Sequence, residues 1–280
     1  MIPLPDWRAR AKTFTHDGHR IAYWDEGDGT PLLLIHGYPS SSHDWHLIWD
    51  ELARDHRVIA CDMLGFGLSD KPNRPYSLHA QADLQEALLA YLGIQNPHAL
   101  VHDYGVSVGQ ELLARGYSLQ SIYFLNGGII PGEHRPRLIQ RIGAGPFGFL
   151  LGYVLDRKRF GKSFSAVFGP NTQPTETELD IHWELIAENG GHRIQHRLLG
   201  YMHDRMTHKA RWVGSLQATD VPLGILNGAL DPVSGRHLYD QVLATVPGIH
   251  ASLLEDIGHY PQIEASDRVI QAYRKFRAEL

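Results

Sequence analysis

The stretch HALVHDYGVSVGQELLAR, residues 98–115, joins a short apolar run to a helical pattern through the four residues His-Asp-Tyr-Gly. The run at 98–101 is typical of a strand buried on both faces, and the segment from 108 onward has apolar residues at helical spacing. Two side chains with nucleophilic oxygens, Asp103 and Ser107, lie one helical turn apart at this junction. Because the two do different chemistry, the choice between them decides which reaction we expect.

Short β-rich runs alternate with helical patterns along most of the chain, which favours an α/β fold with a mostly parallel sheet. A hairpin is predicted at residues 13–27, with its turn at Asp17-Gly18. Helical patterns lie between the later runs, including residues 78–93, which stop at Gly93. The later β-rich runs are found at residues 31–37, 56–62, 98–102, 121–127, 221–228 and 250–256.

The alternation breaks between residues 130 and 213, where no clean buried strand is found. Pro and Gly interrupt an aromatic-rich series of short helical patterns there. We therefore predict a core formed by residues 1–129 and 214–280, with a helical cap at 130–213. The most apolar part, IGAGPFGFLLGYVL at 142–155, is interpreted as a buried helix segment or as a lid over a pocket. The lack of a clear amphipathic pattern disfavours contact with a membrane surface.

The composition argues against several classes of protein. A net charge of −5, without a basic stripe that contains aromatic residues, argues against nucleic acid as a partner. The most apolar stretch is too short to cross a bilayer, which needs about 20 residues, so we expect no stable membrane insertion. Cys61 is the only cysteine, which fits a reducing compartment, and the N-terminus lacks an export signal. We expect a cytoplasmic monomer or homodimer.

Five motifs in a fixed order give the chain a family resemblance. They are HGYPSSSHDW at 36–45, DMLGFGLSDKP at 62–72, HDYG at 102–105, NGALDPV at 227–233 and GHYPQIE at 258–264. Together they cover nearly the whole chain and resemble the α/β-hydrolase family. The Asp-x-Gly turn is similar to that of epoxide hydrolases and haloalkane dehalogenases, and stretches such as VFGP and RWVGSL resemble the mesoderm-specific transcript branch. The resemblance implies a mostly parallel eight-stranded sheet flanked by helices, with an inserted helical cap.

The position of the turn favours Asp103 over Ser107 as the nucleophile. The tip of such a turn directly follows the strand, and the apolar character ends at Val101 or His102. Ser107 lies in a Gly-x-Ser-x-Gly pattern, as in lipases and esterases, but a strand that reached it would bury a carboxylate and an imidazole. Asp103 is also a candidate N-cap residue. Val101 departs from the family pattern, which usually has a small residue two positions before the tip.

The resemblance and the chain order imply roles for further groups. A carboxylate attacks an sp³ carbon that carries a strained or good leaving group and forms an alkyl-enzyme ester. His259 is expected to activate the water that hydrolyses this ester, and Asp231 to orient His259. The backbone N–H groups of Tyr38 and Tyr104 are the expected oxyanion donors. The other residues of the oxyanion-loop motif are His36, Gly37 and Pro39.

The leaving group separates the possible activities. Dehalogenases of this family commonly have a Trp directly after the nucleophile, where this chain has Tyr104. Epoxide hydrolases protonate the epoxide oxygen with cap tyrosines, and the resemblance implies Tyr201, with Tyr153 as a further candidate. We therefore expect a hydrolase that opens a small apolar epoxide to a diol. The alternatives are a dehalogenase, a hydrolase fold retained as a binding protein, and an esterase that uses Ser107. No cofactor is implied, and no set of side chains indicates a metal site.

Overall fold

An eight-stranded sheet runs through the centre of the computed structural model, which describes residues 1–280, in the order β1-β2-β4-β3-β5-β6-β7-β8. β1 and β2 form an antiparallel hairpin, β2 pairs antiparallel with β4, and all other neighbours are parallel. The predicted α/β fold with its mostly parallel sheet is confirmed. The strands are β1 (Lys12–His16), β2 (His19–Glu26), β3 (Thr30–Ile35), β4 (His56–Cys61), β5 (His98–Val101), β6 (Ser121–Phe124), β7 (Leu223–Gly228) and β8 (His250–Leu254).

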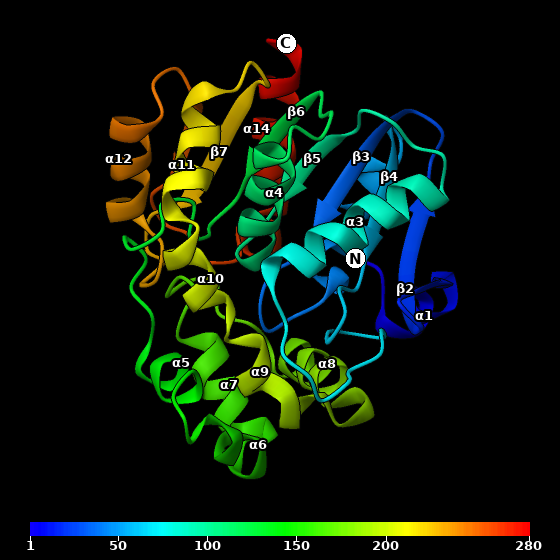
Figure 1. Ribbon diagram of the computed structural model, residues 1–280, viewed down its shortest axis with the longest axis vertical. Helices are drawn as coiled ribbons and strands as arrows, with labels where there is room; N and C mark the ends of the chain where they lie inside the picture. The colour runs from blue at the N-terminus through cyan, green and yellow to red at the C-terminus, as the bar shows by residue number, and fades with distance from the viewer.

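Helices cover both faces of this sheet because its inner strands are apolar on both sides. Figure 1 shows α3, α4 and α11 in front of the strands and α14 behind them. The buried side chains form one apolar cluster on each face. The first face has α3 (Leu78–Tyr91), α4 (Tyr104–Ala114), α11 (Lys209–Ala218) and α12 (Arg236–Thr245); the second has α1 (Leu4–Arg10), α2 (Trp49–Leu52) and α14 (Ser266–Ala278).

A helical insertion follows β6 and lies at one end of the sheet, in the lower half of Figure 1. Its elements are α5 (Leu138–Gly143), η2 (Gly148–Leu150), α6 (Leu151–Val154), α7 (Arg157–Ser165), α8 (Glu176–Ala187), η3 (Glu188–Ile194), α9 (Gln195–Leu198) and α10 (Tyr201–Thr207). The predicted boundary at residue 213 falls inside α11, which packs against α4 of the core. We therefore propose residue 208 as the end of the cap. No helix of the protein combines the length and the apolarity needed to cross a membrane.

An aromatic cluster joins the cap to the core. Phe164 of α7 and Phe168 both pack against Tyr260, with ring centroids 4.9 and 5.1 Å apart. Val233 of the core belongs to the same buried cluster. Tyr260 directly precedes the short helix α13 (Pro261–Glu264), and both core residues follow strand ends. The cap is thus held over the carboxyl ends of the parallel strands, where ligands bind in open α/β sheets.

Candidate active site

Asp103 occupies the tip of a sharp turn between β5 and α4. Its backbone has φ +46° and ψ −104°, a conformation that L-residues rarely adopt and that is retained where the surroundings fix it. The Asp103 N–H donates to the Asn126 carbonyl at 2.8 Å, and the Gly105 N–H donates to the His36 carbonyl at 3.1 Å. A Cβ at Gly105 would lie 2.3 Å from the carbonyl oxygen of Ile35, so only glycine fits there. Strand β3 and the loop after β6 therefore lock the turn.

The structure accounts for the larger residue before this turn. Val101 is fully buried at the end of β5. A Cβ on Gly109 of α4 would lie 3.2 Å from Val101 Cγ1 and 2.8 Å from Ile122 Cδ1. Because Gly109 has no side chain, the helix leaves room for the larger Val101 side chain. A small residue at position 101 is therefore not needed.

Three side chains from separate loops meet at the tip. One Asp103 carboxylate oxygen, Oδ1, accepts a hydrogen bond from the Tyr38 N–H at 2.9 Å. The other, Oδ2, lies 3.4 Å from His259 Nε2. His259 Nδ1 lies 2.6 Å from Asp231 Oδ2. Asp103, His259 and Asp231 are all buried, so their interactions are screened little by solvent.

Asp231 is itself firmly oriented. Its Oδ2 accepts hydrogen bonds from Ser234 Oγ at 2.6 Å and from Asn126 Nδ2 at 3.0 Å, and its Oδ1 accepts one from the Val233 N–H at 2.7 Å. His102 Nε2 lies 2.8 Å from the His259 carbonyl and so fixes the backbone on the other side of the imidazole. Sequence reasoning did not identify Ser234, Asn126 or His102, because these residue types serve many structural purposes.

The charges in this group reinforce one another. Burial alone would lower the pKa of His259, but the charge of Asp231 and the hydrogen bonds to both carboxylates outweigh it and raise that pKa to about 10. Burial alone would raise the pKa of Asp103, but the hydrogen bond and charge of His259 hold it below its usual range. Asp103 is therefore an anion beside an imidazolium, which leaves its carboxylate ready to attack.

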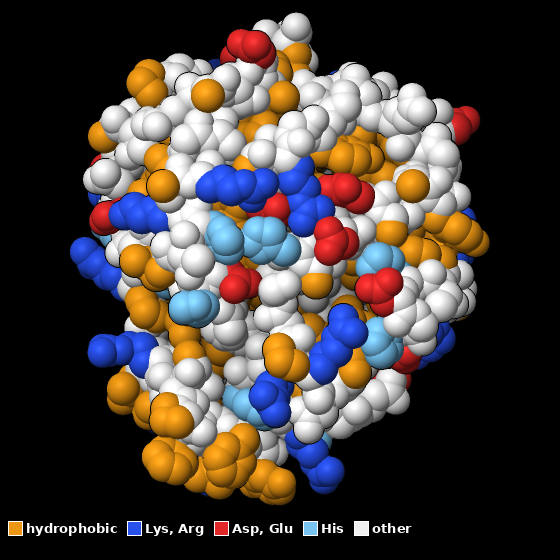
Figure 2. All heavy atoms as spheres, in the orientation of Figure 1, with side chains coloured by type: hydrophobic (Ala, Val, Ile, Leu, Met, Phe, Trp, Pro, Cys, Tyr) orange, Lys and Arg blue, Asp and Glu red, His pale blue; other side chains and the backbone are white.

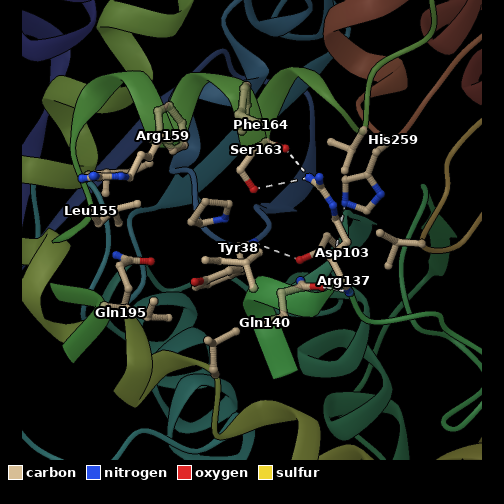
Figure 3. A pocket seen from close by; sticks show the side chains of 18 of the residues that line it. Tyr38, Asp103, Arg137, Gln140, Leu155, Arg159, Ser163, Phe164, Gln195 and His259 are labelled. Carbon is tan, nitrogen blue, oxygen red and sulfur yellow. Dashed lines mark hydrogen bonds and ion pairs between the residues drawn. The ribbon is translucent and has the colours of Figure 1, made fainter. Parts of the chain in front are cut away.

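Asp103 and His259 lie in the wall of a cavity of about 160 Å³ between cap and core. In Figure 3 both lie on the right, with Gln195 and Leu155 on the opposite side. Most of the residues that line the cavity are apolar, and most come from the cap. Leu151 and Leu155, from the stretch at 142–155, are among them. Phe147 and Tyr153 of that stretch are exposed, so the interpretation of a buried helix segment does not hold for all of it, and its role as a lid stays a prediction. No group of three or more His, Cys, Asp or Glu side chains is placed to hold a metal ion.

Comparison with known proteins agrees with this architecture. The family described as alpha/beta hydrolase fold matches residues 30–266. The chain belongs to the α/β-hydrolase family. It is 40% identical to the mesoderm-specific transcript protein of Mus musculus over 98% of this chain and 87% of that protein.

Two solved structures share the fold of this α/β-hydrolase. The epoxide hydrolase CorEH superposes with a TM-score of 0.79 at 20% identity and covers 96% of this chain and 98% of its own. The haloalkane dehalogenase DbeA from Bradyrhizobium elkani USDA94 superposes with a TM-score of 0.80 at 23% identity and covers 96% of this chain and 99% of its own. At these identities the two likenesses establish the fold alone.

Ser107 of the α/β-hydrolase lies inside α4 and is fully buried. Its hydroxyl accepts a hydrogen bond from Arg205 Nε at 2.8 Å. Arg205 Nη2 also donates to the backbone carbonyl of Asp103 at 2.9 Å, and its guanidinium lies 4.5 Å from the centre of the Tyr201 ring. The buried Arg205 therefore ties α10 of the cap to the turn. Sequence reasoning missed it because one arginine in a helical pattern carries no signal of its own.

The structure separates the predicted tyrosines. Tyr201 is buried and packs against Tyr38 and Tyr104, with ring centroids 6.0 and 5.4 Å apart. It does not line the cavity, but its hydroxyl accepts a hydrogen bond at 3.4 Å from Gln140, which does. Tyr153 is 79% exposed and does not line the cavity either. The role implied for Tyr153 is therefore corrected, because its phenol is directed to solvent.

The remaining motif residues surround Asp103. Tyr104 is the first residue of α4, so its N–H belongs to the first turn, which has no intrahelical acceptor. His36 Nε2 accepts from the Met63 N–H at 3.1 Å, and its Nδ1 lies 2.8 Å from the Gly37 carbonyl, so the ring braces the loop. A Cβ on Gly37 would lie 2.8 Å from Asp103 Cβ. Pro39 and the ring of Tyr38 line the cavity; the sequence had indicated only the Tyr38 N–H.

Proposed function

We propose that this α/β-hydrolase opens an apolar epoxide to a diol, with Asp103 as the nucleophile. The observation that carries the proposal is the position of Asp103, whose carboxylate lies in an apolar cavity between an N–H donor and an imidazole. A carboxylate in this setting attacks a strained sp³ carbon productively. Attack on an ordinary acyl carbon would give an anhydride that reverts easily.

In the first step an Asp103 oxygen attacks one epoxide carbon, and the bond between that carbon and the ring oxygen breaks. The ring oxygen leaves with the electron pair and takes a proton from a phenol. The product is a β-hydroxyalkyl ester of Asp103. The ester is neutral, so the negative charge that supports the protonated state of His259 is lost. Formation of the ester therefore lowers the pKa of His259, which passes its proton to the phenolate left by the first transfer and is then neutral and able to act as a base.

In the second step His259 takes a proton from water, and the oxygen of that water attacks the ester carbonyl carbon. The tetrahedral oxyanion is stabilised by the N–H groups of Tyr38 and Tyr104. Its collapse breaks the bond between the acyl carbon and the alkoxy oxygen, and the alkoxide takes the proton of the imidazolium to give the diol. Asp103 is left as a carboxylic acid and gives its proton to the neutral His259, which restores the initial ion pair. Asp231 keeps Nδ1 of His259 protonated and stabilises the imidazolium, which returns its proton to the leaving alkoxide.

We propose Tyr201 as the acid of the first step. Its oxygen accepts from Gln140, which lines the cavity, and donates to no protein group, so no protein acceptor holds its proton. Burial, followed by the charge of Asp103, raises the pKa of Tyr201, so the phenol keeps this proton. Tyr38 is the competing assignment, because its ring lines the cavity directly.

One observation argues against each of the alternative functions. A dehalogenase would use the same covalent route, but this chain has Tyr104 where those enzymes commonly have a Trp donor. A hydrolase fold retained only as a binding protein is disfavoured because Asp231 points toward His259. A serine esterase is disfavoured because the Ser107 hydroxyl faces Arg205 and not an imidazole.

The test is to trap the ester in a variant that cannot hydrolyse it. His259→Gln should still allow alkylation, and the protein should then gain the mass of a whole epoxide on the peptide that contains Asp103. The double variant with Asp103→Asn is the matched control and should gain nothing. An alkyl adduct from haloalkanes alone would favour the dehalogenase, and an acyl group on Ser107 would contradict the proposed nucleophile.

A further inference from the structure

A group of large apolar side chains is exposed on the outer surface of the cap. We call it the apolar patch. Figure 2 shows it as the orange cluster at the lower end of the molecule, over α5 and α6. Its members are 41–79% exposed. They are Leu138, Ile139, Ile142, Phe147, Phe149, Leu150, Tyr153 and Val154.

The exposed apolar residues of this protein are concentrated in the apolar patch and are not spread evenly over the surface. The protein has fourteen exposed large hydrophobic residues, and eight of them lie within residues 138–154. Single exposed apolar side chains are normal on a protein surface, but a contiguous group with two phenylalanines and a tyrosine marks a contact site. The sequence interpretation disfavoured a membrane contact because the stretch lacks one amphipathic helix. The structure instead assembles the apolar face from α5, η2 and α6, which lie in one segment.

Unpaired positive charges lie close to the apolar patch in the sequence. Seven Lys and Arg residues but only two acidic residues occur within residues 133–162, whereas the whole chain has a net charge of −5. Arg157 pairs with Glu176 and Asp180, and Arg159 with Asp156. Four other cations in this segment are exposed and form no ion pair with an acidic side chain. They are Arg135, Arg141, Lys158 and Lys162.

The apolar patch is continuous with the mouth of the cavity that contains Asp103. Ile139 and Val154 are 41% and 49% exposed, yet both also line the cavity. Their neighbours Leu151 and Leu155 extend the apolar wall inward. An apolar molecule can therefore pass from the surface of the patch to the carboxylate along apolar side chains.

We propose that the apolar patch docks reversibly on a membrane surface that contains anionic lipids. The aromatic and aliphatic side chains enter the boundary between headgroups and acyl chains, and the four free cations meet the lipid phosphates. A second copy of this chain is the less suitable occupant. In a two-fold interface the same patch faces itself, so the cations of one protomer would face those of the other. The contact does not depend on which reaction Asp103 performs.

The test measures co-flotation of the full-length protein with two kinds of vesicle, phosphatidylcholine alone and phosphatidylcholine with phosphatidylglycerol. We expect flotation with the anionic vesicles and little with the neutral ones. The double variant Phe147→Ser/Tyr153→Ser should lose most of this binding, and Arg141→Gln/Lys158→Gln should weaken it at least about tenfold. Leu243→Ser is the matched control, because it removes an exposed leucine from α12 of the core and should bind like the wild type.

Several results would overturn the proposal. One is wild-type protein that floats with neither vesicle. Another is a Phe147→Ser/Tyr153→Ser variant, folded by circular dichroism, that floats as well as the wild type. Concentration-dependent dimers that this variant abolishes, without any vesicle binding by the wild type, would instead assign the apolar patch to an interface between copies.

Discussion

His259 Nε2 lies 3.4 Å from Oδ2 of Asp103, on the carboxylate that sits at the tip of the turn. The other oxygen of this carboxylate is held by a backbone N–H. At this distance the imidazole contacts the carboxylate directly, so a water bound to Nε2 would lie next to the ester carbonyl carbon once Asp103 has been alkylated. The proposed chemistry depends on this contact between His259 and Asp103.

Replacement of Asp103 by Asn should reduce turnover by at least about 10³-fold, because an amide does not attack the epoxide. Ser107→Ala should keep kcat within a few fold of the wild type. Loss of the hydroxyl leaves Arg205 Nε without its acceptor, so the free energy of unfolding should fall by about 1–3 kcal/mol. Steady-state kinetics and urea denaturation measure the two effects. An inactive Ser107→Ala variant with wild-type stability would reverse the roles.

The stability of the fold should decrease in alkaline solution because of His259. Its pKa is about 10 in the folded protein, above the value of about 6.5 in an unfolded chain. The stabilisation by the charged imidazole is therefore complete below about pH 6.5 and is lost as the pH rises through about 10. His259→Gln should show a flatter dependence of its urea midpoint between these values. The exposed His203→Gln control should follow the wild type, and a His259→Gln slope equal to that of the wild type would contradict the raised pKa.

Loss of the acid should slow alkylation and not hydrolysis. In the His259→Gln background, Tyr201→Phe should form the epoxide adduct about 10²-fold more slowly or worse, since the ring oxygen leaves without a proton. Tyr38→Phe should leave this rate nearly unchanged, because only the backbone N–H of Tyr38 acts on Asp103. Time-resolved intact mass measures both rates. The opposite order of effects would assign the acid to Tyr38.

Val101 and Gly109 should be energetically coupled. Gly109→Ala places a methyl group 3.2 Å from Val101 Cγ1, and overpacking of this kind costs about 1–3 kcal/mol. In the Val101→Ala background the same change should cost about 1 kcal/mol less. Urea denaturation of the four proteins in the double-mutant cycle gives the coupling. Additive effects would mean that Gly109 does not make room for Val101.

The core of this fold was predictable because its signals are local. Each apolar run ending in Gly, Asp or His became a strand of the sheet, and the hairpin turns at Asp17-Gly18 as predicted. The tip at Asp103 also follows from a local rule, since the strand ends just before it. Its partners Asp231 and His259 could be predicted only with the help of the family resemblance, because nothing local distinguishes one loop histidine among 18.

The directions and contacts of the cap side chains could not be predicted from the sequence, for physical reasons. Its helices are short, and tertiary packing decides which side of each faces the core, so the outward direction of Tyr153 left no periodic trace. Arg205 acts through contacts with Ser107 and Asp103, about one hundred positions away in the chain. The compensation of Val101 by Gly109 joins a strand to a helix in the same way. Such pairings become visible only when the chain is folded.

A single turnover of the wild-type protein, in excess over epoxide, in heavy-oxygen water identifies the nucleophile directly. If Asp103 is the nucleophile, the diol takes its new oxygen from the carboxylate, and the heavy oxygen from water enters Asp103. We predict an unlabelled diol and a heavy oxygen on the peptide that contains Asp103. A diol that carries the heavy oxygen, with an unlabelled peptide, would mean that water attacks the epoxide directly and would contradict the account.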